Sequence, residues 1–317
     1  MYKTGICTSE ELRRRKTIFG RIRPVSCLLL RDSSMSFEAV LTDLSLDRNV
    51  TRLTYRGRFT DLNATVNALL LDRYGPTEEV EIHDWAASDC LSSSEWATEL
   101  LPRLPHAKVV ASDIVLYLVF VKRSGSGHYV LLPDGRPFQF IRPPFVIPLD
   151  RPESAFYPVN RILQGGARRQ LPAVQEAARL AEWSSVLDNR TSVHSAWEIG
   201  KILLVHPEAR LLAQGEPRFL IRNHSVFLPL ASPVQVIRTM NILNLSYFPK
   251  QDLMAGAAAV HSSLMDGGMW ILGRTHEEDR SGRNCVTLFE KRGDRFVVLR
   301  RINGGSEIEP IVADFRS

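Results

Sequence analysis

The strongest constraint on the fold is a strand, helix and strand pattern that follows residue 76. Residues 80–84 and 108–113 contain the β-branched side chains typical of short strands. Between them, residues 92–104 have a helix pattern that opens with a predicted capping box of Ser92 and Glu95. Such a unit places its two strands in parallel, with a right-handed crossover. The sequence therefore predicts an α/β fold with a largely parallel sheet.

The same alternation resumes near residue 217. The predicted elements are, in order, strand 219–222, strand 234–240, helix 250–264, strand 269–273 and the strands 285–290 and 296–301. The last two strands flank a short turn that contains Gly293, which is typical of an antiparallel hairpin. The expected sheet is therefore mostly parallel and ends in an antiparallel pair.

Residues 1–75 come before this pattern and predict an N-terminal helical extension. Its helices are expected near Ser9–Phe19 and Asp61–Leu71, where acidic first-turn residues or an apolar stripe occur. Residues 76–317 form the predicted main domain.

A long stretch inside the main domain, at about residues 115–215, interrupts the alternation. It is predicted to be an insertion that shapes a substrate pocket. A hairpin is expected around Asp134 and Gly135, and helices are expected at Pro172–Leu187 and Ala196–Leu204.

Composition limits the classes of function. With 44% hydrophobic and 24% charged residues among 317, the chain is typical of a globular protein. Its longest apolar runs, such as Val115–Val121, are far shorter than the roughly 18 residues that span a bilayer, so no membrane partner is expected. The net charge is +5, but basic residues are dispersed apart from Arg13–Lys16, so nucleic acid is not an expected partner. Four scattered cysteines, without metal-ligand spacing, indicate a reducing compartment, the cytoplasm, and no metal site.

The turn after the first strand is the first candidate binding element. Asp84 is followed by a run of small residues and then by the start of a helix, whose free N–H groups suit a nucleotide-like ligand. Asp113 ends the second strand, where its carboxylate can accept hydrogen bonds from two ribose hydroxyls; the alternative is an ordinary solvated strand end. Gly267 and Gly268 join a helix to a strand, and Gly267 is expected at the end of that helix with a positive φ.

In these features the chain resembles the class I S-adenosylmethionine (AdoMet)-dependent methyltransferases, over about residues 78–115 and 217–302. In that family the first strand is followed by D-x-G-x-G-x-G, and here Ala86, Ser88 and Cys90 stand at the glycine positions, which is a departure. The resemblance implies that Asp84, Ala86 and Ser88 bind the cofactor. The family's acidic ribose ligand corresponds to Asp113.

The resemblance also assigns roles to residues after the other strands. It places Ile114 beside the adenine and Ser225 on the adenine side, where the family commonly has an Asp. Asn241 is expected to contact the methionine end of the cofactor or a polar group of the substrate, and Asn244 and Tyr247 are expected to bind substrate.

Catalysis in this family is mainly alignment of a nucleophile with the reactive group of the cofactor. Candidate catalytic residues are His224, as a base, and Tyr247, which lines the methyl-transfer channel; the alternatives are a structural histidine and a half-buried packing residue. The implied fold is a Rossmann-like, seven-stranded, mostly parallel sheet with a C-terminal antiparallel hairpin, an N-terminal extension and a mid-chain insertion.

The leading hypothesis is an AdoMet-dependent methyltransferase that acts on an oxygen or nitrogen of a small-molecule acceptor. The alternative is a methyltransferase-like protein that has lost catalysis and acts in binding or regulation, because the turn is poor in glycine. A nicotinamide-dependent oxidoreductase ranks last, because the required G-x-G-x-x-G turn is missing. A homodimer is left open.

Overall fold

The computed structural model describes residues 37–42, 52, 54–123, 127–142, 145–150, 158–276 and 282–316. The predicted helix at Ser9–Phe19 lies outside these residues. The chain divides into two compact units. One, here called the parallel-sheet unit, contains the described residues within 54–116 and 205–317. The other, the insertion unit, contains those within 1–46, 51–53 and 117–204.

The parallel-sheet unit is built on a seven-stranded sheet in the order β13-β12-β11-β10-β1-β2-β9. Its strands are β1 (Val80–Trp85), β2 (Ala107–Asp113), β9 (Phe219–Asn223), β10 (Val234–Met240), β11 (Leu264–His276), β12 (Arg283–Arg292) and β13 (Arg295–Ile302). The five strands from β9 to β11 in the sheet pair in parallel, and β12 pairs antiparallel with both of its neighbours. The predicted α/β class, with a mostly parallel sheet and a C-terminal antiparallel hairpin, is confirmed.

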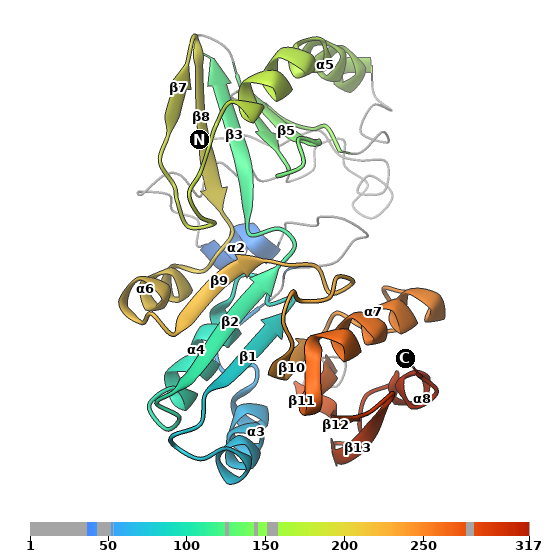
Figure 1. Cartoon of the computed structure of the whole chain (residues 1–317). Helices are drawn as coiled ribbons and strands as arrows, with labels where there is room; N and C mark the ends of the chain where they lie inside the picture. The colour runs from blue at the N-terminus through green and yellow to red at the C-terminus, as the bar shows by residue number, and fades with distance from the viewer. Residues whose placement is uncertain are drawn as a thin grey trace. The chain divides into compact units, whose positions relative to one another are not determined.

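Helices cover the two faces of this sheet (Figure 1). They are α3 (Thr60–Arg73), α4 (Leu91–Leu100), α6 (Pro207–Gly215), α7 (Lys250–Ser263) and α8 (Glu309–Ala313). Trp85 belongs to an apolar cluster with Leu253 and Val260 of α7. Its neighbour Asp84 contacts Ser93 of α4. Because successive strand residues point to opposite faces, α7 and α4 cover opposite sides of β1.

The strand order reverses at β1. After β1 the chain continues to β2 on one side, and it later returns to β10 on the other side. In open α/β sheets, ligands bind beyond the carboxyl ends of the strands at such a switch point. The carboxyl ends of β1, β2 and β10 are therefore where a site is expected.

The insertion unit contains a six-stranded sheet in the order β6-β5-β4-β3-β8-β7. Its elements are α2 (Phe37–Thr42), β3 (Tyr117–Arg123), β4 (His128–Leu131), β5 (Pro137–Arg142), β6 (Phe145–Pro148), α5 (Pro158–Arg179), β7 (Ser192–His194) and β8 (Trp197–Leu203). All of its strand pairs are antiparallel. The apolar side chains of Leu171 and Val174 attach α5 to this sheet.

Two helix predictions in the insertion are wrong. Residues 196–204 were predicted as a helix, but Trp197–Leu203 is strand β8, which pairs with β3 along its whole length. The predicted helix start at Pro172 is also wrong, because α5 begins at Pro158 and continues past this proline, which lies on its exposed side. A short apolar run does not by itself distinguish a strand from a helix, and here the pairing partner decides.

The double glycine does not end a helix, contrary to the prediction. Helix α7 ends at Ser263, and Gly267 lies inside β11 with the predicted positive φ, 77°. In the pairing of β10 with β11, residues 265–268 stand opposite Gln235 alone, so they form a bulge. Bulges need a residue that tolerates a left-handed backbone, and glycine supplies it.

None of the helices among the described residues is long and apolar enough to cross a lipid bilayer.

Candidate functional site

The turn between β1 and α4 has an unusual backbone. Ala86, Ser88 and Cys90 have φ values of 57°, 56° and 65°, which is the left-handed region that favours glycine. These are the three positions at which the family that the sequence resembles has glycine. Each such residue costs about 1–2 kcal/mol. Residues 86–90, here called the strained turn, must therefore be held in place by their surroundings.

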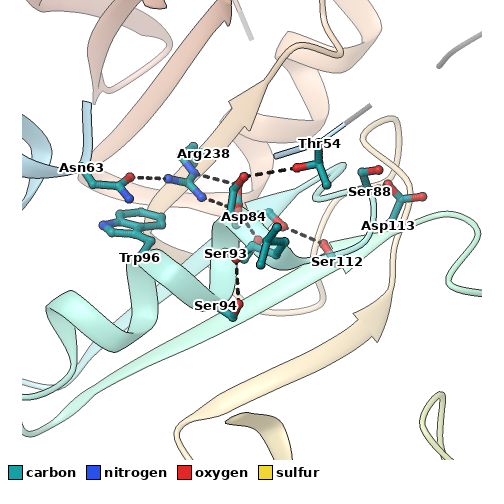
Figure 2. Close-up of polar contacts among 12 residues, drawn as sticks. Thr54, Asn63, Asp84, Ser88, Ser93, Ser94, Trp96, Ser112, Asp113 and Arg238 are labelled. Atoms are coloured by element: carbon teal, nitrogen blue, oxygen red, sulfur yellow. Dashed lines mark hydrogen bonds and ion pairs between the residues drawn. The ribbon is translucent and has the colours of Figure 1, made fainter. Parts of the chain in front are cut away.

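Strand β2 holds the middle of the strained turn. The Ser88 N–H donates to Oδ2 of Asp113 at 2.9 Å, and the Ala87 N–H donates to the carbonyl oxygen of Ser112 at 2.9 Å. Figure 2 shows Ser88 next to the carboxylate of Asp113. The predicted partners Asp113 and Ser88 are thus brought together, by a hydrogen bond between the turn and the end of β2.

The predicted capping box is not formed. The N-cap residue of α4 is Cys90, in its left-handed conformation, and its side chain makes no cap hydrogen bond. The Asp89 carboxylate accepts the N–H of Leu91, the first residue of the helix, at 3.1 Å. The Glu95 carboxylate instead accepts the N–H of Gly57, and the Ser92 hydroxyl lies 3.4 Å from that of Thr54. These contacts attach the segment before α3 to α4.

Asp84 lies in a buried ion pair at the start of the strained turn (Figure 2). Arg238, on the neighbouring strand β10, donates from Nε to Oδ1 at 2.9 Å and from Nη2 to Oδ2 at 2.5 Å. The Ser93 hydroxyl donates to Oδ2 at 2.5 Å. The carboxylate is therefore occupied by the protein's own donors, and the role of Asp84 as a cofactor ligand stays a prediction.

The guanidinium of Arg238 has further partners. Its Nη1 donates to Oδ1 of Asn63 at 2.9 Å, and its Cζ lies 4.0 Å from the ring centroid of Trp96. Trp96 in turn donates from Nε1 to Asn67 at 2.7 Å. Sequence reasoning missed this network. A lone arginine inside the otherwise uncharged buried strand 234–240 is the signal that could have revealed Arg238.

The end of β2 presents a carboxylate and an apolar side chain together. Asp113 is buried, with Oδ1 accepting the Val115 N–H at 3.1 Å and Oδ2 accepting from Ser88. Its neighbour Ile114 is 65% exposed. A carboxylate beside exposed apolar surface suits a ligand that has both hydroxyl groups and a flat ring.

Two aromatic rings meet near the end of β9. The ring centroids of Trp85 and His224 are 4.5 Å apart. Trp85 Nε1 and His224 Nε2 are buried and have no hydrogen-bond partner in the part of the chain that the structure describes. Burial, and then the charge of nearby His83, hold the pKa of His224 below its ordinary value. Because its pKa is lowered, His224 is neutral near pH 7. Next to it, the Ser225 hydroxyl accepts the Phe227 N–H at 3.3 Å.

The loop after β10 is organised by two asparagines. Asn241 has a φ of 63°, and its side chain accepts the Thr275 N–H at 2.7 Å. Asn244 is buried; its oxygen accepts the N–H groups of Ser246 and Tyr247, and its amide donates to carbonyl oxygens of the same loop. These side chains fix the shape of the loop, and their direct contact with a cofactor or substrate stays a prediction.

Tyr247 is half-buried and packs against the apolar cluster around α7, with its ring 6.5 Å from that of Phe248. The structure thus places the predicted residues in two groups. The first group lies at the ends of β1, β2 and β9 and contains Asp84, Ala86, Ser88, Asp113, Ile114, His224 and Ser225. The second group follows β10 and contains Asn241, Asn244 and Tyr247. Within the described part of the chain, no three His, Cys, Asp or Glu side chains gather as a metal site.

No protein-family profile and no curated protein matches the chain. Solved structures that resemble it include the AdoMet-dependent methyltransferase SibL in its apo form, at 10% identity and a TM-score of 0.29, over 70% of this chain and 39% of that one. A protein-L-isoaspartate O-methyltransferase matches at 11% identity and a TM-score of 0.30, over 77% of this chain and 47% of that one. The O-methyltransferase NcsB1 from neocarzinostatin biosynthesis, in complex with S-adenosyl-L-homocysteine (SAH) and 1,4-dihydroxy-2-naphthoic acid, matches at 9% identity and a TM-score of 0.27, over 68% and 40%.

The chain thus spans less than half the length of each of these three proteins.

Proposed function

We propose that the parallel-sheet unit binds AdoMet at the carboxyl ends of β1 and β2, and that the protein transfers the methyl group to an oxygen or nitrogen of a small molecule. One observation carries this proposal. Ala86, Ser88 and Cys90 keep the left-handed backbone of a glycine-rich binding turn although none of them is glycine. Strained backbone of this kind is concentrated at functional sites.

The residues present fit the cofactor. Asp113 is the candidate for the ribose hydroxyls, because its carboxylate lies at the end of β2. The exposed Ile114 offers an apolar surface to the adenine. Ala86 and Ser88 are half-buried and have side chains small enough to permit a ligand to approach. When bound, AdoMet supplies an electrophilic methyl group on a sulfonium. The protein's part is to align the acceptor and to exclude water.

The acceptor side is assigned to the loop after β10 and to His224. Tyr247 is the candidate for contact with the acceptor, in a loop whose shape Asn241 and Asn244 fix. His224 is the candidate base: its imidazole is neutral near pH 7, and its Nε2 is buried without a hydrogen-bond partner among the described residues. A neutral imidazole can accept the proton of an alcohol, a phenol or an ammonium group as methyl transfer proceeds.

Calorimetry with SAH tests the binding step. We expect a Kd in the micromolar range for the wild type. Asp113→Ala should weaken it roughly 10- to 100-fold, because a charge-assisted hydrogen bond contributes about 1.5–3 kcal/mol. Asp113→Asn removes the charge but keeps an oxygen that can accept the Ser88 N–H. Comparison of the two variants therefore distinguishes the effect of the lost charge from the effect of a lost hydrogen bond to the turn. Asp72→Ala, at an exposed position of α3, is the matched control and should bind like the wild type. No heat of binding for the wild type would reject the proposal.

A second candidate function is binding or regulation without catalysis. The observation that favours it is the Asp84 carboxylate, which Arg238 and Ser93 occupy. Incubation with methyl-labelled AdoMet and small-molecule extracts separates the two candidates. Label in any acceptor supports the transferase, whereas SAH binding without transfer supports the non-catalytic protein.

A further inference from the structure

A buried ion pair adjoins the strained turn, and the binding roles above do not use it. The guanidinium of Arg238 meets both carboxylate oxygens of Asp84, and the two side chains are only 1% and 5% exposed. A pair at this depth is seldom more stabilising than apolar side chains of similar volume. Stability alone therefore does not account for it.

The Asp84 carboxylate joins the two ends of the strained turn. Asp84 belongs to β1, where the turn begins, and it accepts the hydroxyl of Ser93, in the first turn of α4, where the turn has ended. All three left-handed residues lie between these two in the sequence. One carboxylate thus fixes the separation of the strand and the helix that the turn connects.

Arg238 fixes the direction of that carboxylate. Its planar group donates to both oxygens at once, which a lysine ammonium does not do. The guanidinium is itself fixed by Asn63 and by the face of Trp96. Because Arg238 comes from β10, the pair also joins β10 to β1 across the point where the strand order reverses.

We propose that Arg238 and Asp84 form a clamp that keeps residues 86–90 in the shape required to bind the cofactor, and that Arg238 is a positioning residue. Glycine adopts a positive φ without steric strain. A turn with side chains at those three positions needs external constraints, and the clamp acts on its two ends while Ser112 and Asp113 of β2 hold its middle. This inference rests on the proposed AdoMet site.

The test removes both charges together, in the double variant Asp84→Val/Arg238→Met, so that no unpaired charge is left buried. SAH binding is measured by calorimetry, and the mobility of residues 86–90 is measured by amide hydrogen exchange. We expect the Kd to rise about tenfold or more, about 1.4 kcal/mol, and the exchange of this segment to become faster, while the unfolding midpoint stays near that of the wild type. The matched control is Glu216→Val/Arg218→Met, which removes an ion pair of 2.7 Å before β9 and should change neither quantity.

A rescue experiment distinguishes a clamp from general support of the fold. Ala86→Gly, added to the Asp84→Val/Arg238→Met variant, should recover SAH affinity, because glycine adopts the required backbone without the ion pair. Failure of this rescue overturns the proposal. If the double variant does not fold, Arg238→Lys is used instead. Lysine keeps the charge but does not donate to both carboxylate oxygens at once, so an unchanged Kd would overturn the proposal as well.

The outcomes for the proposed site and for the clamp are separate. A wild-type protein that binds no SAH rejects the AdoMet site, and the exchange data still test the clamp. A wild type that binds SAH, together with a double variant that binds equally well and exchanges residues 86–90 no faster, rejects the clamp alone.

Discussion

Two neighbouring alanines allow the strain in the β1–α4 turn to be measured. Ala86 has a φ of 57°, whereas Ala87 is not among the residues with a positive φ. Alanine in the left-handed region costs about 1–2 kcal/mol, and glycine costs about 0.5–1 kcal/mol in lost chain entropy wherever it is introduced. Ala87→Gly should therefore be destabilising by the entropy alone. Ala86→Gly should be neutral or stabilising, because the strain is relieved.

The difference between the two variants is the informative quantity, because the chemical change is the same. It should be about 1–2 kcal/mol, because both alanines are half-buried and each variant loses one methyl group. Native-state hydrogen exchange of the β1 and β10 amides measures it within the parallel-sheet unit, which is preferable to a global melt for a chain of two compact units. Equal changes in the two variants would refute the strain argument.

Two further predictions concern packing and pH. Gly273→Ala should destabilise the sheet by about 1–3 kcal/mol in urea unfolding, because a Cβ there would come within 2.5 Å of a backbone oxygen of β12; Gly215→Ala, which meets nothing within 4 Å, should not be destabilising. Burial, and then the charge of Lys122, lower the pKa of His128 from 6.5 to about 4. Between these two pH values the unfolded chain binds more protons than the fold, so the stability of the insertion unit should fall as the pH is lowered from about 6.5 to about 4. His128→Phe should weaken this dependence in thermal unfolding, whereas substitution of the exposed His106 should leave it unchanged.

The parallel part of the fold was predictable because its signals are local. Strands β1, β2, β9 and β10 differ from their predicted ranges by at most one residue at either end. Each is a short run with β-branched residues between turn signals, and each lies next to its parallel neighbours in a sheet whose helices follow the usual right-handed order. The insertion was less predictable, because the pairing of β8 with β3 joins segments about eighty residues apart in the sequence.

The site was predictable only in part, for a similar reason. The positions of Asp113 and of the turn followed from their places at the ends of strands. The partner of Asp84 did not, because Arg238 is 154 residues away in the sequence. The left-handed backbone at Ala86 and Cys90 was also not predictable from side-chain type, since neither residue favours it. Long-range contacts enforce that conformation.

Residues 117–204, the larger part of the insertion unit, leave and rejoin the rest of the chain through neighbouring strands. The first and last long strands of this segment are neighbours, with Tyr117 paired to Leu203, so the two connecting segments start side by side. A module attached in this way resembles an enlarged hairpin: it can be gained, lost or exchanged in evolution without changing the register of any other strand. Diversity in residues 117–204 can therefore arise by exchange of the whole segment, while the seven-stranded sheet keeps its strand pairing and changes only by point substitutions.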